Sequence, residues 1–188
     1  MKVFKMECMK KTTDTTLKDF LRFKDFLYRN FKNFEKYKDM LPTSSQPAQL
    51  YGLAKTHKFE KITDINLEQL KFRPIIAQVG TSTYKAAQVI ANYLKPLISE
   101  NNNIIKNTQS FPELLKNQPT LEPTEEYVSY DVESLFTNVP VRETIDYIID
   151  QIYNKNKLNP IATKLVFKGL LLKLATESIF IFNNQFYR

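Results

Sequence analysis

The sequence predicts an α+β fold, because helical and strand patterns follow one another without regular alternation. Apolar residues spaced by three and four predict an amphipathic helix over Leu17–Tyr37. Short aromatic and β-branched runs predict strands over Tyr51–Lys58 and Phe72–Val79. The 188 residues are 43% hydrophobic and 13% aromatic, which is enough to form the core of one domain or of a lobe of a larger one.

Capping residues, turn-forming residues and apolar spacing predict the other elements. Thr15 and Thr16 are candidate caps of the first helix. Gly80–Thr83 marks a turn before a helix over Tyr84–Leu94 that Pro96 kinks or ends. The later predictions are a short helix near Pro112–Lys116, a strand over Tyr127–Val132, helices over Val141–Tyr153 and Ile161–Thr176, and a hairpin over Ile179–Tyr187 that turns at Asn183-Asn184. The hairpin is expected to leave a hydrophobic strand edge unpaired, and hence to make the isolated chain poorly stable.

Composition excludes several classes of site and favours a polyanionic partner. The formal net charge is +7, with +6 in residues 1–60, +3 in residues 61–120 and −2 in residues 121–188. This basic front favours a polyanion bound there. A solvated Lys-rich surface is the alternative. The single Cys8 and the single His57 argue against a disulfide and against a Cys-rich or His-rich metal site. No long apolar run and no signal-like start are present, so we expect no membrane span and an intracellular protein, nuclear or cytoplasmic, rather than a secreted one.

The segment from Val128 to Pro140 carries the strongest chemical signal. Asp131 stands at the end of the predicted strand, where its carboxylate either binds Mg²⁺ or caps the following turn. Phe136 follows five residues later, and its ring either closes a sugar pocket or packs in the core. Glu133, at an offset of two, ranks second as local support for Asp131.

Four blocks in order give the chain a family resemblance. They are Leu50–Lys58, Phe72–Ile76 with Gly80–Tyr84, the Asp131 segment, and Phe182–Tyr187. From about Thr16 to Arg188 the chain resembles the front part of a reverse transcriptase, most closely those of Penelope-like retroelements. The resemblance implies the fingers and a partial, incomplete palm of a right-hand polymerase. The corresponding regions are a basic helical region at 1–45, a fingers-like region at 46–125 and the first half of the palm at 126–188.

The resemblance also implies roles for individual residues. Asp131 is similar to the first catalytic aspartate, a ligand of two Mg²⁺ ions, and the Val132 carbonyl would complete the coordination of the nucleotide-bound ion. Phe136 would be the steric gate that favours dNTPs over ribonucleotides. Cations of the fingers would grip the incoming triphosphate, namely Arg73 and, with less support, Lys55, Lys58 and Lys71; an exposed strand edge is the alternative for the lysines. His57 would have a structural role or contact the template. The implied partners are an RNA template, a DNA primer and a dNTP.

Departures from the family pattern qualify the expected activity. Ala54 and Thr56 replace a proline and a more apolar residue that family members usually carry. The sequence stops at Arg188, before the glycine-rich block and the paired aspartates that the family has downstream. We therefore expect the isolated chain to lack polymerase activity. The alternative interpretation is a non-catalytic nucleic-acid-binding relic of a retroelement.

Overall fold

The computed structural model describes residues 10–56, 70, 72–99, 105, 107–132 and 135–188. The chain divides into two compact units, which are described separately. Unit 1 contains Met1–Asn92 and Pro160–Arg188, and unit 2 contains Tyr93–Asn159. Within the described ranges no helix is long and apolar enough to cross a membrane.

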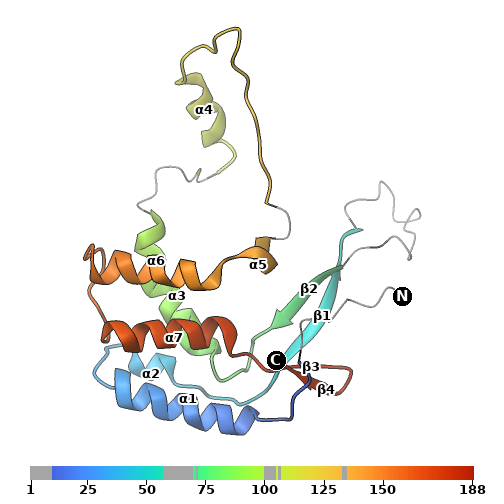
Figure 1. Cartoon of the computed structure of the whole chain (residues 1–188), viewed down its shortest axis with the longest axis vertical. Helices are drawn as coiled ribbons and strands as arrows, with labels where there is room; N and C mark the ends of the chain where they lie inside the picture. The colour runs from blue at the N-terminus through green and yellow to red at the C-terminus, as the bar shows by residue number, and fades with distance from the viewer. Residues whose placement is uncertain (1–9, 57–69, 71, 100–104, 106, 133–134) are drawn as a thin grey trace. The chain divides into compact units, whose positions relative to one another are not determined.

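Unit 1 combines helices with a mixed β-sheet, so the predicted α+β class is confirmed (Figure 1). Its elements are α1 (Thr16–Phe31), α2 (Tyr37–Met40), β1 (Ala48–Ala54), β2 (Phe72–Ala77), most of α3 (Tyr84–Ser99), α7 (Lys164–Thr176), β3 (Phe180–Phe182) and β4 (Gln185–Tyr187). Unit 2 contains the end of α3 with α4 (Ser110–Lys116), α5 (Leu135–Asn138) and α6 (Val141–Tyr153).

The sheet has the strand order β2-β1-β3-β4. β1 and β2 pair antiparallel, β1 and β3 pair parallel, and β3 and β4 form an antiparallel hairpin. The hairpin turns at Asn183 and Asn184, whose φ angles of 47° and 56° match the two positive angles of a type I′ turn. The predicted hairpin is therefore confirmed, and its first strand, β3, lies beside β1, whereas β4 lies on the far side of β3.

The outer edge of β4 is covered, contrary to expectation. Lys11 bridges Tyr187 in antiparallel register, and the backbones of Lys10 and Arg188 exchange two hydrogen bonds of 3.1 and 3.0 Å. The N–H of Thr12 donates to the Phe186 carbonyl at 3.0 Å. The predicted unpaired edge is thus wrong, because a segment far away in the sequence supplies the missing partner.

The buried face of α1 differs from the predicted stripe. Phe23, Leu27 and Phe31 are buried at steps of four, whereas Leu17 and Leu21 remain 63% and 57% exposed. α1 also ends at Phe31, so the predicted helix over Leu17–Tyr37 is split. Apolar spacing alone did not reveal which of two neighbouring stripes faces the core.

The start of α1 is fixed by a residue other than the predicted caps. Thr15 occupies the N-cap position but makes no side-chain cap bond. Asp14 Oδ1 instead accepts hydrogen bonds from the Thr16 N–H at 3.0 Å and from the Thr16 hydroxyl at 2.6 Å. These two bonds lower the pKa of the exposed Asp14 carboxyl.

Most predicted helices are present with small changes at their ends. The helix over Val141–Tyr153 has the predicted bounds, and its residues Ile145, Ile149 and Ile152 are buried. The short helix before Asn117 is also confirmed. The sequence predicts that Pro96 kinks or ends the helix over Tyr84–Leu94. α3 continues through Pro96 to Ser99, so Pro96 does not end the helix, and the kink stays a prediction. A proline removes a single N–H donor, and the neighbouring turns keep their own hydrogen bonds.

Candidate functional site

The β1–β2 pair places Arg73 on a sheet face beside Tyr51 and Leu53. Arg73 lies directly opposite Leu53, and Ile75 lies opposite Tyr51. Cross-strand partners and residues two positions apart share one face of a pleated sheet. Because Tyr51, Leu53 and Arg73 are all exposed, this face presents a guanidinium beside an aromatic ring and an aliphatic side chain.

On the opposite face of the pair, the Phe72 side chain lies close to Gly52. A Cβ at Gly52 would lie 3.1 Å from Cδ1 of Phe72. The glycine therefore lets the Phe72 ring approach the backbone of β1. This contact helps to hold the two strands in the register that places Arg73.

The other cations expected to grip a triphosphate are only partly described. Lys55 follows β1 directly and is half-buried. Lys58, Lys71 and the neighbouring His57 lie outside the described residues. Arg73 and Lys55 are therefore the members of the predicted set that the structure places, both at the end of the β1–β2 pair distant from Gln49 and Ala77.

Asp131 and Val132 lie in an exposed stretch without regular secondary structure. The predicted strand over Tyr127–Val132 is therefore wrong. The side chain of Tyr130 in this stretch is 92% exposed. Strand propensity needs a neighbouring strand to bond with, and no strand within the described ranges pairs with this stretch. Phe136 belongs to α5, and its side chain lies outside the described part of the chain, as does Glu133.

The described residues do not by themselves form a magnesium site. Mg²⁺ takes six oxygen ligands in an octahedron, whereas the predicted set offers the Asp131 carboxylate and the Val132 carbonyl. In the described ranges no three His, Cys, Asp or Glu side chains gather as a possible metal group. Asp131 belongs to unit 2, and Arg73 and Lys55 belong to unit 1.

The helix α1 carries a basic exposed surface. Lys18 and Arg22 are exposed in its first half and Lys24 and Arg29 in its second half, and the exposed Lys32 directly follows its last residue. Arg29 forms an ion pair with Asp25 at 2.9 Å, and Lys32 Nζ lies 5.9 Å from the centroid of the Tyr28 ring. The surface matches the basic front expected from the sequence and can attract phosphate groups.

Unit 1 also contains a small polar cavity, partly open to solvent, that the sequence did not indicate. The cavity has a volume of about 30 Å³, and hydroxyl, amide and carboxylate side chains line it, namely Thr16, Asp19, Ser45, Gln46, Gln78, Thr81, Ser82, Thr83, Glu177 and Ser178, together with Ile179. Two of the lining residues bond to each other, since Gln78 Nε2 donates to the Ser178 hydroxyl at 2.8 Å. Its volume suits bound water rather than a nucleotide. No spacing rule could reveal it, because the lining comes from separate segments of the chain.

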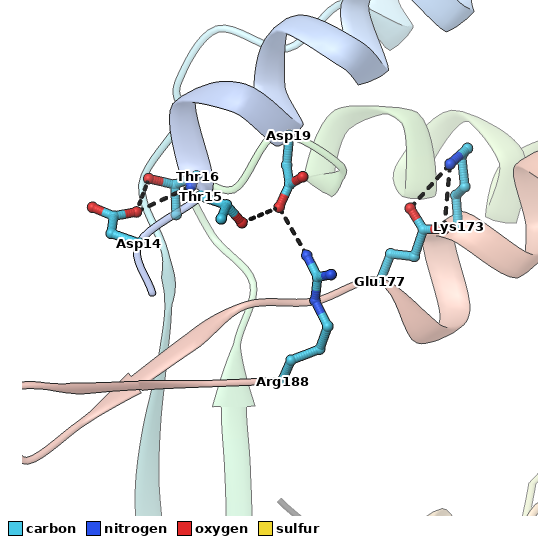
Figure 2. Close-up of polar contacts among 7 residues, drawn as sticks. All are labelled: Asp14, Thr15, Thr16, Asp19, Lys173, Glu177 and Arg188. Atoms are coloured by element: carbon cyan, nitrogen blue, oxygen red, sulfur yellow. Dashed lines mark hydrogen bonds and ion pairs between the residues drawn. The ribbon is translucent and has the colours of Figure 1, made fainter. Parts of the chain in front are cut away.

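The first turn of α1 contacts Arg188 (Figure 2), and Asp19 of this turn also lines the cavity. Arg188 Nη2 donates to Asp19 Oδ2 at 2.9 Å, and the Thr15 hydroxyl donates to the same oxygen at 2.7 Å. Farther along, Lys173 Nζ pairs with Glu177 at 3.0 Å. Lys173 Nζ also lies 5.8 Å from the centroid of the Phe26 ring, so α7 contacts α1.

Comparisons with protein-family models, with curated proteins and with solved structures found no match.

Proposed function

We propose that this chain is the fingers and the first half of the palm of an RNA-directed DNA polymerase, of the kind found in Penelope-like retroelements. In the complete enzyme the reaction would be template-directed addition of a dNTP by two-metal phosphoryl transfer. The four ordered sequence blocks support the proposal. The single structural observation that favours it is the antiparallel β1–β2 pair, which carries two of those blocks side by side and leaves Arg73 exposed.

Each predicted residue has a specific task in this proposal. Arg73 and Lys55 would contact the oxygens of the incoming triphosphate, because charge-assisted hydrogen bonds are the strong ones available to phosphate. Asp131 would supply one carboxylate ligand of Mg²⁺, with the Val132 carbonyl beside it and Phe136 against the sugar. Further carboxylates would have to complete the metal site.

The gene provides the first test. The transcript is sequenced beyond the codon for Arg188. An open frame with a glycine-rich block and paired aspartates would support the polymerase. An immediate stop would overturn the enzymatic proposal and leave nucleic-acid binding as the function.

A binding experiment tests the role of Arg73 directly. A fluorescent dNTP is titrated into the chain in the presence of an RNA–DNA primer–template, with wild type compared with Arg73→Gln. We expect about a tenfold loss of dNTP affinity, which corresponds to about 1.4 kcal/mol. Arg142→Gln, on the exposed surface of α6, is the matched control. An equal loss of dNTP affinity in both variants would contradict a specific contact between Arg73 and the triphosphate.

Nucleic-acid binding without catalysis is the second candidate, and the basic surface of α1 favours it. Lys18→Gln and Arg22→Gln should each reduce the slope of log K against log salt by about one if each residue contacts a phosphate. Asp131→Asn should leave this binding unchanged. A salt slope that does not respond to either α1 substitution would overturn this candidate.

A further inference from the structure

The outer edge of β4 offers the backbone groups that a further strand would bond. The carbonyl of Phe186 and both backbone groups of Arg188 face outward from the hairpin, since each bonds to Lys10 or Thr12. Such an edge is a template for pairing with another chain. The aromatic side chains of Phe186 and Tyr187 are only half-buried, so pairing with another strand would bury more apolar surface.

The segment Lys10–Thr12, here called the strap, occupies this edge. It contributes three backbone hydrogen bonds to β4, two from the Lys10–Arg188 exchange and one from Thr12 to Phe186. Lys10 and Lys11 are exposed. Short edge strands that carry lysine are poor templates for further pairing. The outer edge of the strap is therefore less prone to pair with another strand than the edge of β4 that it covers.

A side-chain ion pair next to the strap also joins α1 to the end of β4. The strap leads through Asp14 and Thr15 into α1, whose residue Asp19 holds the Arg188 guanidinium at 2.9 Å (Figure 2). Arg188 is therefore held twice, by its backbone through Lys10 and by its side chain through Asp19. Both contacts are at least partly exposed, so water can replace them when the strap leaves.

We propose that the strap is a detachable edge strand that controls self-association of this chain. When the strap leaves, the free edge of β4 pairs with β4 of a second copy. An antiparallel pair centred on Tyr187 brings Arg188 of each copy opposite Phe186 of the other, so each backbone donor meets an acceptor around a two-fold axis. The occupant is thus a second copy of the same edge, and the device does not depend on the proposed polymerase chemistry.

Two proline variants provide a matched test. Thr12→Pro removes the N–H that bonds to Phe186. Lys11→Pro removes an N–H that the alternation of an antiparallel ladder directs away from β4. Molar mass is measured by light scattering during gel filtration over a range of concentrations. We expect Thr12→Pro to show at least twice the mass of Lys11→Pro, with Lys11→Pro matching wild type.

Some outcomes of these measurements would overturn the proposal. Equal masses for all three proteins, or an increase in both variants, would overturn the proposal. A second measurement covers the case in which Thr12→Pro fails to fold. In wild type, hydrogen exchange of the Lys10, Thr12 and Arg188 amides should be at least tenfold faster than exchange of the hydrogen-bonded amides of the β1–β2 pair. If all of these amides exchange at one common rate, the strap does not detach, and the proposal fails.

Discussion

Arg188 donates a hydrogen bond from its guanidinium to Asp19 Oδ2 over 2.9 Å, although 169 positions separate the two residues. Asp19 stands in the first turn of α1, and Arg188 directly follows β4. The pair joins the first helix to the last hairpin of unit 1. The same oxygen of Asp19 accepts the Thr15 hydroxyl at 2.7 Å, so the helix start and the hairpin share one carboxylate.

This ion pair should contribute modestly to stability. The two side chains are 49% and 32% exposed, so solvent screens the attraction and a coupling of about 0.2–1 kcal/mol is expected. A double-mutant cycle with Asp19→Asn and Arg188→Gln, followed by urea unfolding, measures the coupling. It should fall as salt is raised. The more exposed Asp25–Arg29 pair is the control, and a coupling no larger than that of the control would contradict the structural role of Asp19.

Leu27 should matter far more than its neighbour Leu21 on the same helix. Leu27 is completely buried, whereas Leu21 is exposed. Leu27→Ala should lower the free energy of unfolding by about 2–5 kcal/mol, because it leaves a cavity in the core. Leu21→Ala should change it by less than about 0.5 kcal/mol. Urea unfolding compares them, and similar costs would show that the buried face of α1 is assigned wrongly.

A β-branched residue in place of Asn184 should destabilise the hairpin turn. Asn184 has a φ of 56°, where an ordinary side chain costs about 1–2 kcal/mol. Asn184→Val should therefore lower the melting temperature. Asn184→Gly, which tolerates positive φ, should leave it unchanged or raise it slightly. Thermal melts followed by circular dichroism separate the two outcomes, and equal effects of both substitutions would argue against a type I′ turn.

Unit 2 should lose stability at alkaline pH through Tyr93. Burial, with a smaller effect of Tyr153, raises the pKa of Tyr93 to about 12 from the ordinary value of 10.0. The unfolded chain therefore releases this proton at lower pH than the folded chain. The stabilising contribution is complete below pH 10 and is lost as the pH rises towards 12. The ring is partly solvated, so the loss is on the order of 1 kcal/mol.

A Tyr93→Phe variant isolates this effect. At neutral pH it loses the hydrogen bond from the Tyr93 hydroxyl to the Asn159 carbonyl, which has a length of 2.8 Å, at a cost of about 0.5–1.5 kcal/mol. The difference in stability between wild type and the variant should shrink between pH 10 and 12. Urea midpoints measured across that range provide the comparison, and parallel pH profiles would contradict the assignment.

The sequence by itself determined the elements whose signals are local. The isoleucine stripe of α6 and the Asn183-Asn184 turn specify a helix and a hairpin through spacing and backbone preference, and both are present as predicted. The proposed chemistry of Arg73 and Asp131 rests instead on the resemblance of four ordered blocks to reverse transcriptases, and it stays a proposal. The helix and turn signals are readable because each involves neighbours within a few positions of one another.

Tertiary structure alone decided the features that depend on distant partners. The strap on β4, the Asp19–Arg188 pair and the polar cavity each join segments from opposite ends of the sequence of unit 1. The exposed stretch around Asp131 illustrates the converse, because residues with high strand propensity form no strand without a neighbour to bond with. Backbone pairing and burial are satisfied only in three dimensions, and periodicity along the chain carries no information about which distant segment will satisfy them.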